Sequence, residues 1–570
     1  MKLVCKQLSG QILKDKVFLL LLFVLTALTS LSFFFVMFSI DGNMAVLNRM
    51  GKLTENQLLY RNALHSNTIL AYNFFITLTA LTAFVFLLFF YRFFRANKKQ
   101  IGCIKALGFK NSFLQNFFTG FTAVLSFPGA IAGMIGGYFL SDVLLRANAQ
   151  TYEVTGLTKG LGIFGLLTGF FVPAVVFYVT ALLCYGFVRN TDAGTLLAGN
   201  DRQERVSWAL KTADTISRIM PSGKRFPLRI ALRKPLSVLL LLIAVMAFQV
   251  CIILGQSLNI SSEKVFGMQT EGHNYEYEIR FLRPQTDSVP ENAAAYLESP
   301  VTLELGTYVL ERKITGLYQT GGLYELKNRN GELLAVPEEG KVYMNPELSE
   351  IYGVKIGDTL TVQIKNRPYL FAVSDIAVNA KSGSVYINGK ELSEIEGVPD
   401  GAYNGVLSAE EMPGDEVTAR EQRIDDLNRN AVSNKISAVI NQAAGILAGA
   451  ILIFLALYIN FQDNTRDMLI LGLTGYRTRD IRKMFVDVYL PVLWAAFAVT
   501  LVPAVFLART IQHSLSVSTN DYMPFGTNIA VILTAFCLIH IIYWGVQITF
   551  SLGIRRVTGK RDITEVVNAE

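Results

Sequence analysis

Apolar residues along this chain are gathered into eight long runs, separated by polar segments. A helix needs about 20 predominantly apolar residues to cross the hydrocarbon core of a membrane. The runs lie at Val17–Ile40, Ile69–Tyr91, Phe117–Leu144, Leu161–Val188, Leu236–Gln256, Ala438–Ile459, Val488–Leu507 and Thr527–Leu552. The pattern therefore predicts a polytopic α-helical membrane protein with eight transmembrane helices.

The composition strengthens this prediction. Charged residues make up 17% of the chain and the mean hydropathy is +0.37, whereas soluble domains carry about 25% charged residues. These values argue against a soluble enzyme and against a disordered chain. The first run is too long for the apolar region of a signal peptide, and no small-residue cleavage site follows it. We therefore expect an uncleaved first helix.

Basic residues indicate which side of the membrane each loop occupies. The segments on one side hold 29 Lys and Arg residues, and the short loops on the other side hold 6. Cytoplasmic loops carry an excess of Lys and Arg. We therefore expect both termini in the cytoplasm.

One polar segment, residues 257–435, is far longer than the others. It holds 17 basic and 28 acidic residues, so its net charge is −11 while the whole chain carries +7. Long loops cross the membrane largely regardless of their charge, and the order of the spans places this one outside. The five cysteines all lie elsewhere, so no disulfide framework is expected here. We expect residues 257–434 to form an extracytoplasmic domain, which we call the outer domain.

Two cytoplasmic loops of the chain resemble each other, which indicates an internal repeat. Setting Gly108 against Gly475 also pairs Phe109 with Tyr476, Leu114 with Ile481 and Phe118 with Phe485. The apolar spacing before each glycine predicts an amphipathic helix on the membrane surface, at about 98–110 and 465–477. Each half of the chain also has one span, an external segment and then three spans. These features predict a parallel repeat of four plus four helices.

The predicted boundaries follow from the spans and the repeat. The first half has only a short external segment, at about 41–68. The predicted regions are the first four-helix half at 1–190, a cytoplasmic linker at 191–235, the fifth span at 236–256, the outer domain at 257–434, the last three spans at 435–553 and a cytoplasmic tail at 554–570.

At this point the chain resembles a known family. The segment Ile104–Lys110 (IKALGFK), with a second copy at Leu471–Arg477 (LGLTGYR), is similar to the loop motif of FtsX-like permeases of MacB-type ABC transporters. That motif usually carries an acidic residue early in the helix; Asp467 supplies it in the second copy, but Gln100 stands there in the first. Residues 341–361 resemble the MacB-like core domain. Their local chemistry predicts a strand, a short helix, a Gly357-Asp358 turn and a strand.

The resemblance implies a permease subunit whose ATPase is a separate chain. No nucleotide-binding motif is found in the sequence, so no cofactor is expected and ATP would be used by the partner, an ABC ATP-binding subunit, in two copies per chain. A second permease subunit remains open. The residues implied to contact the ATPase are Lys98, Lys99, Ile101, Ile104, Leu107, Gly108, Phe109, Arg466, Met468, Leu471, Gly475 and Tyr476. The alternative is that these helices only bind lipid headgroups of the bilayer.

Other patterns are less specific. Gly129, Gly133 and Gly137 recur every four residues and predict close helix packing, either static or at a moving interface. His540 is alone in its span, which favours a packing role. Residues 421–440 predict a helix that continues into the sixth span as a stalk. We find no catalytic constellation and no metal-ligand spacing in the sequence.

Three functions remain open from the sequence. The resemblance favours export or removal of amphipathic peptides, including antimicrobial peptides, or of lipids, at a bacterial cell membrane. The acidic outer domain mildly favours cationic cargo. The alternatives are an FtsX-like regulator of an extracellular cell-wall hydrolase, without transport, and a sensor module for a kinase. Nucleic acid is not an expected partner, because the basic residues report the orientation of the spans.

Overall fold

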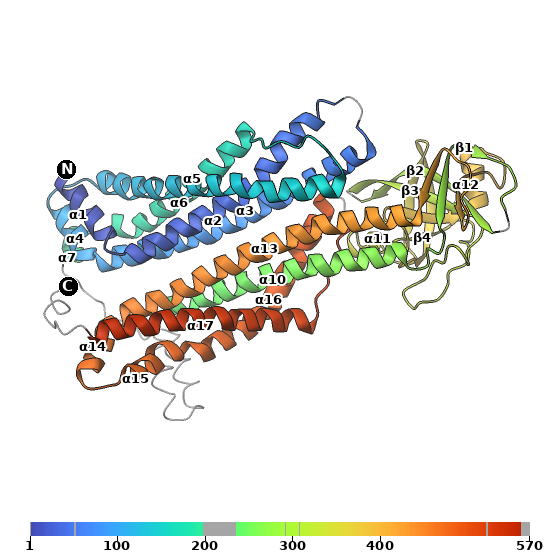
Figure 1. Ribbon diagram of the computed structural model, residues 1–570. Coiled ribbons are helices and arrows are strands. Elements are labelled where there is room, and N and C mark those ends of the chain that lie inside the picture. The colour runs from blue at the N-terminus through green and yellow to red at the C-terminus, as the bar shows by residue number, and fades with distance from the viewer. Residues whose placement is uncertain are drawn as a thin grey trace. The chain divides into compact units, whose positions relative to one another are not determined.

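The computed structural model describes residues 2–50, 53–197, 235–290, 292–306, 308–519 and 522–559. Most of the predicted linker 191–235, and the predicted tail beyond residue 559, lie outside the described residues. The chain divides into two compact units (Figure 1). We call residues 1–254, 439–508 and 528–570 the membrane unit, and residues 255–438 with 509–527 the outer unit.

Helices make up the described part of the membrane unit. The first half contains α1 (Lys2–Ile12), α2 (Lys16–Leu47), α3 (Glu55–Ala96), α4 (Lys98–Ala106), α5 (Asn111–Tyr152), α6 (Ile163–Arg189) and α7 (Ala193–Leu197). The second half contains α10 (Pro235–Thr270), α13 (Arg420–Asp463), α14 (Thr465–Leu473), α15 (Thr478–Arg482), the π-helical turn η1 (Lys483–Asp487), α16 (Tyr489–Thr519) and α17 (Ile529–Gly559).

Seven helices of the described residues are long and apolar enough to cross a membrane. The sixth predicted span, Ala438–Ile459, is not among them; its apolar part is the shorter segment Gly445–Ile459 within α13. The eight-helix 4+4 arrangement is therefore not confirmed as predicted. The helix itself is 44 residues long, so the predicted stalk is continuous with the apolar segment.

The external segment predicted at 41–68 is mostly helical. Helix α2 continues to Leu47, and α3 begins at Glu55. Thr54 and Gln57 form a capping box at the start of α3, in which each side chain bonds the backbone of the other residue. The helices are thus longer than the predicted spans, because a helix can extend beyond the hydrocarbon core where its caps and packing allow.

The main core of the membrane unit contains side chains from both halves. Phe86 and Phe177 of the first half and Leu452 and Ile539 of the second half are all fully buried in one cluster. The rings of Phe86 and Phe177 stack with 4.4 Å between centroids, a separation typical of aromatic pairs. The two halves therefore form one packed body.

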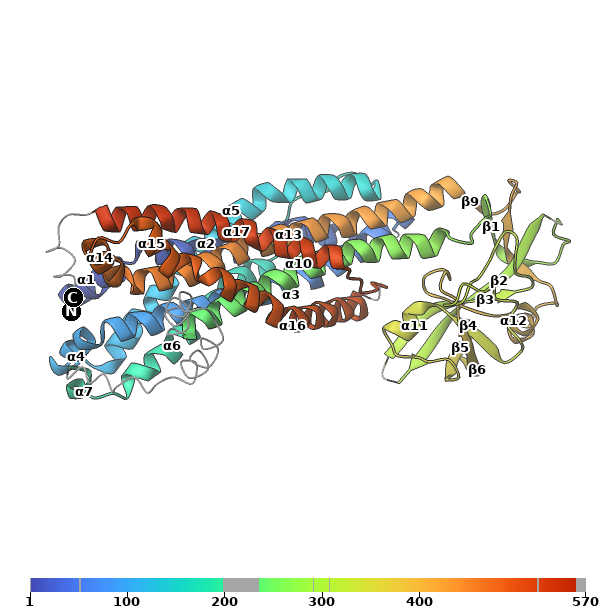
Figure 2. The same cartoon turned by 90° about the horizontal axis from the view of Figure 1, so that it is seen from below.

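The outer unit is built on one mixed sheet of nine strands (Figure 2). The strands are β1 (Tyr277–Gln285), β2 (Ala293–Leu305), β3 (Tyr308–Leu317), β4 (Lys341–Met344), β5 (Thr359–Ile364), β6 (Arg367–Ile376), β7 (Ser384–Asn388), β8 (Tyr403–Ser408) and β9 (Glu416–Ala419). Their order is β3-β7-β4-β6-β5-β2-β8-β1-β9, and β3 also pairs with β2. That additional pairing closes six strands into a ring, from which β8, β1 and β9 extend.

The long strand β2 makes the closure possible. Its 13 residues pair with β3 along one edge, while the other edge pairs with β5 near one end and with β8 near the other. Inside the ring lies an apolar core that includes Leu303, Ile314, Val342 and Val362, all with 0% exposure. The ring carries the short helices α11 (Pro346–Glu350) and α12 (Gly389–Glu396).

The stretch 341–361 folds as its local chemistry predicts. Strand β4 is followed by α11, whose N-terminus is capped by the side chain of Asn345. Gly357 then adopts a φ of +92°, which permits the turn into β5.

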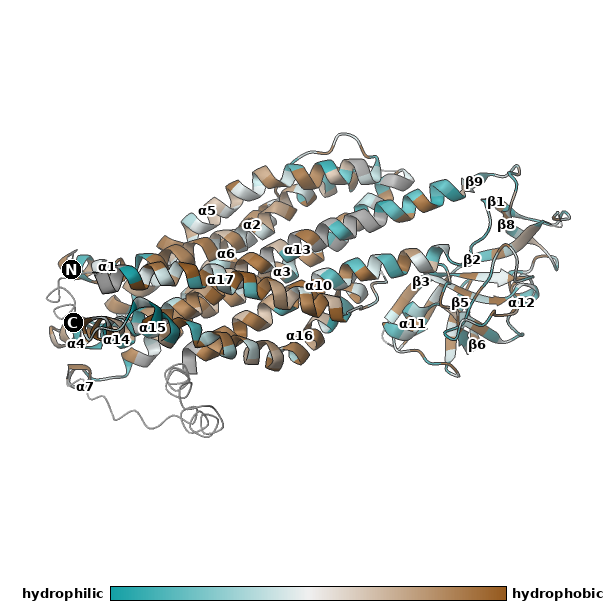
Figure 3. Cartoon of the chain, turned by 60° about the horizontal axis from the view of Figure 1, so that its bottom comes forward, coloured by the Kyte–Doolittle hydropathy of each residue, from teal (hydrophilic) through white to brown (hydrophobic). Residues whose placement is uncertain are grey.

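Hydropathy changes along the stalk helix α13. Figure 3 shows polar residues where α13 approaches β9 and apolar residues along α16 and α17. The change marks the division of α13 between the two units near residue 438.

Candidate functional site

The short helices α4 and α14 are structural equivalents. Each has nine residues and follows a long helix after a single asparagine, Asn97 or Asn464. Each ends before a glycine with positive φ, +85° at Gly108 and +90° at Gly475. The alignment of the two loops is therefore confirmed at the level of backbone conformation.

The predicted contact residues divide into a buried and an exposed set. Ile101, Ile104 and Met468 are at most 5% exposed and belong to the main core; Leu471 and Phe109 are partly buried. They hold the helices in place rather than offering surface to another protein. The accessible residues are Lys98, Lys99, Leu107, Gly108, Arg466, Gly475 and Tyr476.

Helix α4 is fastened to the end of α6. The ammonium of Lys105 donates to the carbonyls of Val188, Arg189 and Thr191 at 2.8, 3.2 and 3.0 Å. The last carbonyls of a helix lack partners within the helix, and a cation there interacts favourably with the helix dipole. Gly102 lies so close to α7 that an added Cβ would be 2.9 Å from the Cβ of Leu196. Sequence reasoning missed Lys105, because its partners are 83–86 residues away.

In the second half, hydrogen bonds join α17 to the turn η1, which follows α14 and α15 along the chain. The guanidinium of Arg482 lies 3.5 Å from the carboxylate of Asp487, as expected for an ion pair at this end of the span. Gln547 of α17 donates to the same carboxylate. Tyr543 donates to the carbonyl of Val486 at 2.8 Å. A π-helical turn interrupts the regular backbone hydrogen bonding of an α-helix. The Tyr543 hydroxyl therefore provides a hydrogen bond to the Val486 carbonyl within this irregular turn.

The predicted glycine stripe brings α5 against the backbone of α2. An added Cβ would lie 2.9 Å from the Thr26 side chain at Gly129, 2.5 Å from the Ala27 carbonyl at Gly133 and 2.7 Å from the Phe35 nitrogen at Gly137. Small residues allow helices to approach this closely. The close approach at these glycines suits tight helix packing, and at Gly133 and Gly137 the nearest neighbours include backbone atoms of α2.

A polar bridge joins the two halves just before the short helices. Gln462 of α13 donates to the Asp15 carboxylate at 2.7 Å and accepts from Arg92 of α3 at 3.2 Å. Tyr458 also contacts Asp15, at 3.5 Å. Arg92 and Gln462 lie within one or two turns of Asn97 and Asn464, so the bridge connects the approaches to both short helices. Sequence reasoning missed this bridge, because the contact is between distant segments.

Both ring nitrogens of His540 have partners, one in its own helix α17 and one in the neighbouring helix α16. Its Nε2 accepts from the indole of Trp494 at 2.6 Å, and its Nδ1 lies 2.8 Å from the carbonyl of Phe536. Because Nε2 must accept and Nδ1 must donate, the ring is neutral. A packing role accounts for this histidine.

The outer unit contains a buried cluster of charges. The Glu278 carboxylate receives bonds of 2.8 Å from Lys381 and Tyr296 and of 3.1 Å from Arg280. Burial opposes the charge on Glu278, but Lys381 and Arg280 outweigh burial and hold its pKa well below the usual range. Burial and nearby Lys381 lower the pKa of His273 to about 4, so this histidine is neutral at pH 7.

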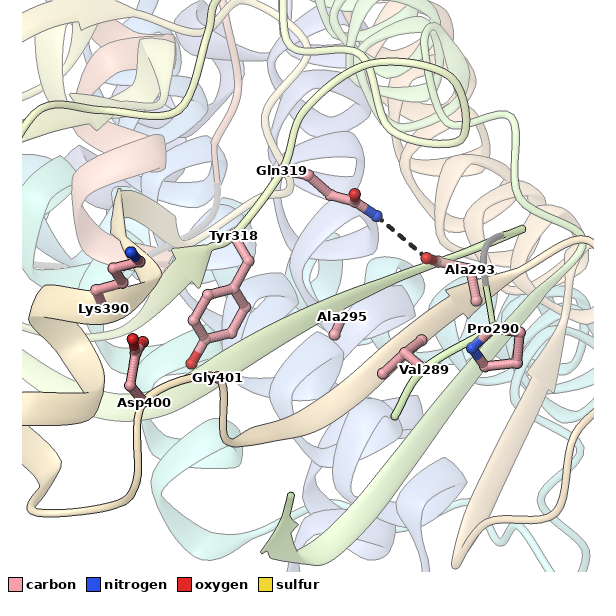
Figure 4. A pocket seen from close by; sticks show the side chains of 9 residues that line it. All are labelled: Val289, Pro290, Ala293, Ala295, Tyr318, Gln319, Lys390, Asp400 and Gly401. Carbon is pink, nitrogen blue, oxygen red and sulfur yellow. Dashed lines mark hydrogen bonds between the residues drawn. The ribbon is translucent and has the colours of Figure 1, made fainter. Parts of the chain in front are cut away.

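A cavity of about 440 Å³ opens on the outer unit (Figure 4). Figure 4 shows Tyr318, Lys390 and Asp400 on one side and Val289 and Pro290 across from them. Its lining mixes one cation, one anion and apolar groups, so it defines no particular ligand. Within the part of the chain that the structure describes, no group of three or more His, Cys, Asp or Glu residues could hold a metal ion.

Comparisons with known proteins agree with the repeat. A family model described as the FtsX-like permease C-terminal domain matches residues 73–193 and, again, residues 443–558. The two matched ranges contain α4 and α14, respectively. The periplasmic region of MacB from Actinobacillus actinomycetemcomitans is 14% identical to this chain, which covers 78% of that structure over 25% of its own length, with a TM-score of 0.18. Among curated proteins no significant match is found.

Proposed function

We propose that this chain, which contains two FtsX-like permease domains, is the membrane subunit of an ABC transporter driven by separate ATP-binding subunits. The observation that carries the proposal is the pair of equivalent helices α4 and α14. Both expose basic residues, Lys98 and Lys99 on α4 and Arg466 on α14, together with apolar side chains such as Leu107 and Leu473, while Ile101, Ile104 and Met468 lie in the core. Two equivalent surfaces on one chain suit two copies of one partner.

The anchoring of these helices supports a mechanical role. Lys105 fastens α4 to the end of α6, Met468 packs α14 into the main core, and η1, further along the chain, bonds to α17. A force applied to α4 therefore reaches α6 through hydrogen bonds, and a force applied to α14 reaches the long helices through core packing. In this mechanism closure of the ATP-binding subunits moves both helices, and the long helices carry the motion outward to the outer unit.

Charge reversal on the exposed residues tests the docking surfaces. The chain is co-expressed with an ABC ATP-binding subunit, and the complex is recovered by affinity purification. The triple variant Lys98→Glu, Lys99→Glu and Arg466→Glu should reduce the recovered ATP-binding subunit about tenfold or more, because opposed charges at a docking surface are costly.

The matched control is Arg146→Glu. Arg146 is exposed near the far end of α5, so it undergoes the same change of charge roughly 50 Å along the helix from α4. The control complex should be recovered in full. Undiminished recovery with the triple variant would contradict docking at α4 and α14.

For cargo we propose cationic amphipathic peptides, with lipids as the second class. The support is the net charge of −11 on residues 257–435, which attracts cations over the distance set by ionic screening. ATP hydrolysis by the reconstituted complex should rise when a cationic amphipathic peptide is added, but not with its Lys→Glu counterpart. A cell-wall hydrolase bound to the outer unit, without peptide stimulation, would favour the regulatory alternative instead.

A further inference from the structure

The two loops of the repeat differ in charge. After the glycine with positive φ, residues 477–483 carry a net charge of +3, whereas the equivalent residues 110–116 carry +1. Three cations of the second half stand where the first half has uncharged polar residues: Arg479 for Ser112, Arg482 for Gln115 and Lys483 for Asn116. Both loops lie at the same end of the membrane unit (Figure 1). The rule that sets the orientation of spans applies to both loops, so it does not account for the difference.

The side chains of α15 and η1 divide between a buried face and an exposed face. Ile481 and Phe485 are at most 3% exposed and belong to the main core. Arg479 and Lys483 are four residues apart, which places them on one face of a helix, and both are exposed. Arg477, which precedes α15, is exposed as well. We call Arg477, Arg479 and Lys483 the basic face.

The charges of the basic face are available to a ligand. Among the described residues, none of its three side chains forms an ion pair. The fourth cation of this segment, Arg482, lies 3.5 Å from the Asp487 carboxylate instead. Asp480 is the only acidic residue of the segment 477–483 and offsets a single charge. The segment therefore keeps a net positive charge on its exposed side.

The basic face lies at the depth expected for lipid headgroups. The candidate span Thr478–Ser518 begins with α15, and its last residues belong to the outer unit, so α15 is at the cytoplasmic end of this span. The apolar run begins at Met484, and Arg479 lies about 8 Å before it along the helix. The headgroup layer on each side of a bilayer is roughly 5–8 Å thick. Arg479 and Lys483 thus fall within this layer, and Arg477 lies at its edge.

We propose that the basic face binds the headgroup of an anionic phospholipid in the inner leaflet. Basic residues next to the cytoplasmic end of a span attract anionic lipids, and the guanidinium fork of arginine matches the geometry of a phosphate group. The equivalent residues 110–116 contain one cation only, so at this position the second half alone holds a lipid. The inference goes beyond the proposed transport function and does not depend on an ATP-binding subunit.

Native mass spectrometry of the full chain in neutral detergent tests the lipid site. The probes are dioleoyl phosphatidylglycerol, which is anionic, and dioleoyl phosphatidylcholine, which has the same acyl chains but no net charge. The unmodified chain should bind phosphatidylglycerol at least tenfold more tightly, because each cation at a membrane surface contributes about fivefold in affinity. Equal affinity for the two lipids would overturn the proposal.

Neutralising the basic face should remove this preference. The triple variant Arg477→Gln, Arg479→Gln and Lys483→Gln should lower the affinity for phosphatidylglycerol at least tenfold and change the affinity for phosphatidylcholine less than twofold. Unchanged binding of phosphatidylglycerol would contradict the site. If the triple variant does not fold, Arg479→Gln alone should lower the affinity for phosphatidylglycerol about fivefold.

The matched control removes three exposed cations from the cytoplasmic end of the first half, with Lys14→Gln, Lys16→Gln and Lys110→Gln. This variant should change the affinity for either lipid less than twofold. A loss of phosphatidylglycerol binding equal to that of the basic-face variant would show that the total charge attracts the lipid, and the proposal would be wrong.

Two further measurements separate a lipid site from other uses of the same cations. Equimolar inorganic phosphate should not displace the bound lipid; displacement would indicate a site for soluble anions. In the co-purification described above, the basic-face variant should recover the ATP-binding subunit in full. Lost recovery with unchanged lipid affinity would assign the basic face to that subunit instead. The lipid measurement uses the chain alone, so it stands even if docking at α4 and α14 is disproved.

Discussion

The two halves of the membrane unit contain equivalent helices but fasten them differently. In the first half, Gly129, Gly133 and Gly137 bring α5 against the backbone of α2. The repeat places Ala496, Thr500 and Ala504 at the corresponding positions of α16. There the contact with α10 includes side-chain hydrogen bonds, in which Gln249 donates to the Phe497 carbonyl at 3.0 Å and accepts from Thr500 at 2.7 Å.

The two halves also differ in the contacts made by their external loops. In the first half, the loop after α5 bonds back to α2, with Asp41 accepting from Gly162 at 2.8 Å and Asn43 accepting from Thr158 at 2.9 Å. In the second half, residues 509–527 belong to the outer unit itself, where Tyr522 donates to the Glu350 carboxylate at 3.0 Å. The first half is therefore closed on itself, whereas the corresponding segment of the second half is part of the outer unit.

The largest expected effect tests the backbone contact. Gly133→Val places a branched side chain where an added Cβ would already lie 2.5 Å from the Ala27 carbonyl. We expect a destabilisation of about 3 kcal/mol or more from overpacking. Thr500→Val at the equivalent position loses only a hydrogen bond, which in membranes costs about 0.6 kcal/mol on average.

Thermal unfolding of both variants in detergent measures this difference. A loss of stability with Gly133→Val no greater than with Thr500→Val would remove the contrast between the halves.

The next largest expected effect is a loss of stability at low pH, which we expect in the outer unit but not in the first half. His273 is 1% exposed and has a pKa of about 4 when folded, against 6.5 as its ordinary value. Between these pH values the unfolded state binds more protons, so stability falls as the pH drops from 6.5 to 4, by up to about 3 kcal/mol. Glu278, which shares Lys381 as a neighbour, adds to this loss at the acidic end, since its pKa is held low by folding.

Amide exchange at pH 7 and pH 4.5, corrected for intrinsic rates, checks this expectation. Residues 273–280 should lose protection on acidification, while the first-half loop 153–162, which contains no histidine, should not. His273→Gln should remove most of the dependence above pH 4.5. An unchanged pH dependence in this variant would assign the effect to other groups.

The smallest effect concerns the anchor of α4. Lys105→Met removes the cation from the last carbonyls of α6, while Gly472 at the equivalent position of α14 has no side chain to lose. Bonds to a charged group contribute about 1.5–3 kcal/mol when buried, and we reduce this to about 1 kcal/mol because Lys105 is partly exposed. Exchange of α4 amides should therefore rise about fivefold.

The exposed Lys99→Met serves as the control for that substitution. Equal exchange of α4 in the two variants would show that Lys105 does not anchor the helix.

Much of the fold could be predicted from the sequence, because its signals are local. Span length, the repeat around Gly108 and Gly475, and the turn at Gly357 each depend on a few neighbouring residues. The predicted stalk was also recovered, since apolar periodicity continues through the start of α13.

The missing parts depend on contacts between distant residues. The closure of the ring through β2 and β3 is set by pairing that no local pattern encodes. Lys105, Asp15 and Gln462 acquire their roles only when the helices pack. The residues predicted to contact the ATPase at α4 and α14 proved to be partly buried and partly exposed for the same reason. A helical pattern predicts which residues share one face of the helix, but it does not predict what that face packs against.

The pairing of β1 with β9 has one more consequence. Tyr277 lies opposite Ala419, so the strand that enters the sheet and the strand that leaves it are adjacent. A domain whose two ends are neighbours is readily inserted into an existing chain, because it does not force the flanking segments apart. This geometry lets one half of an ancestral duplication acquire a large outer module while the other keeps a short connection. A single domain insertion can thus produce the difference between the two halves.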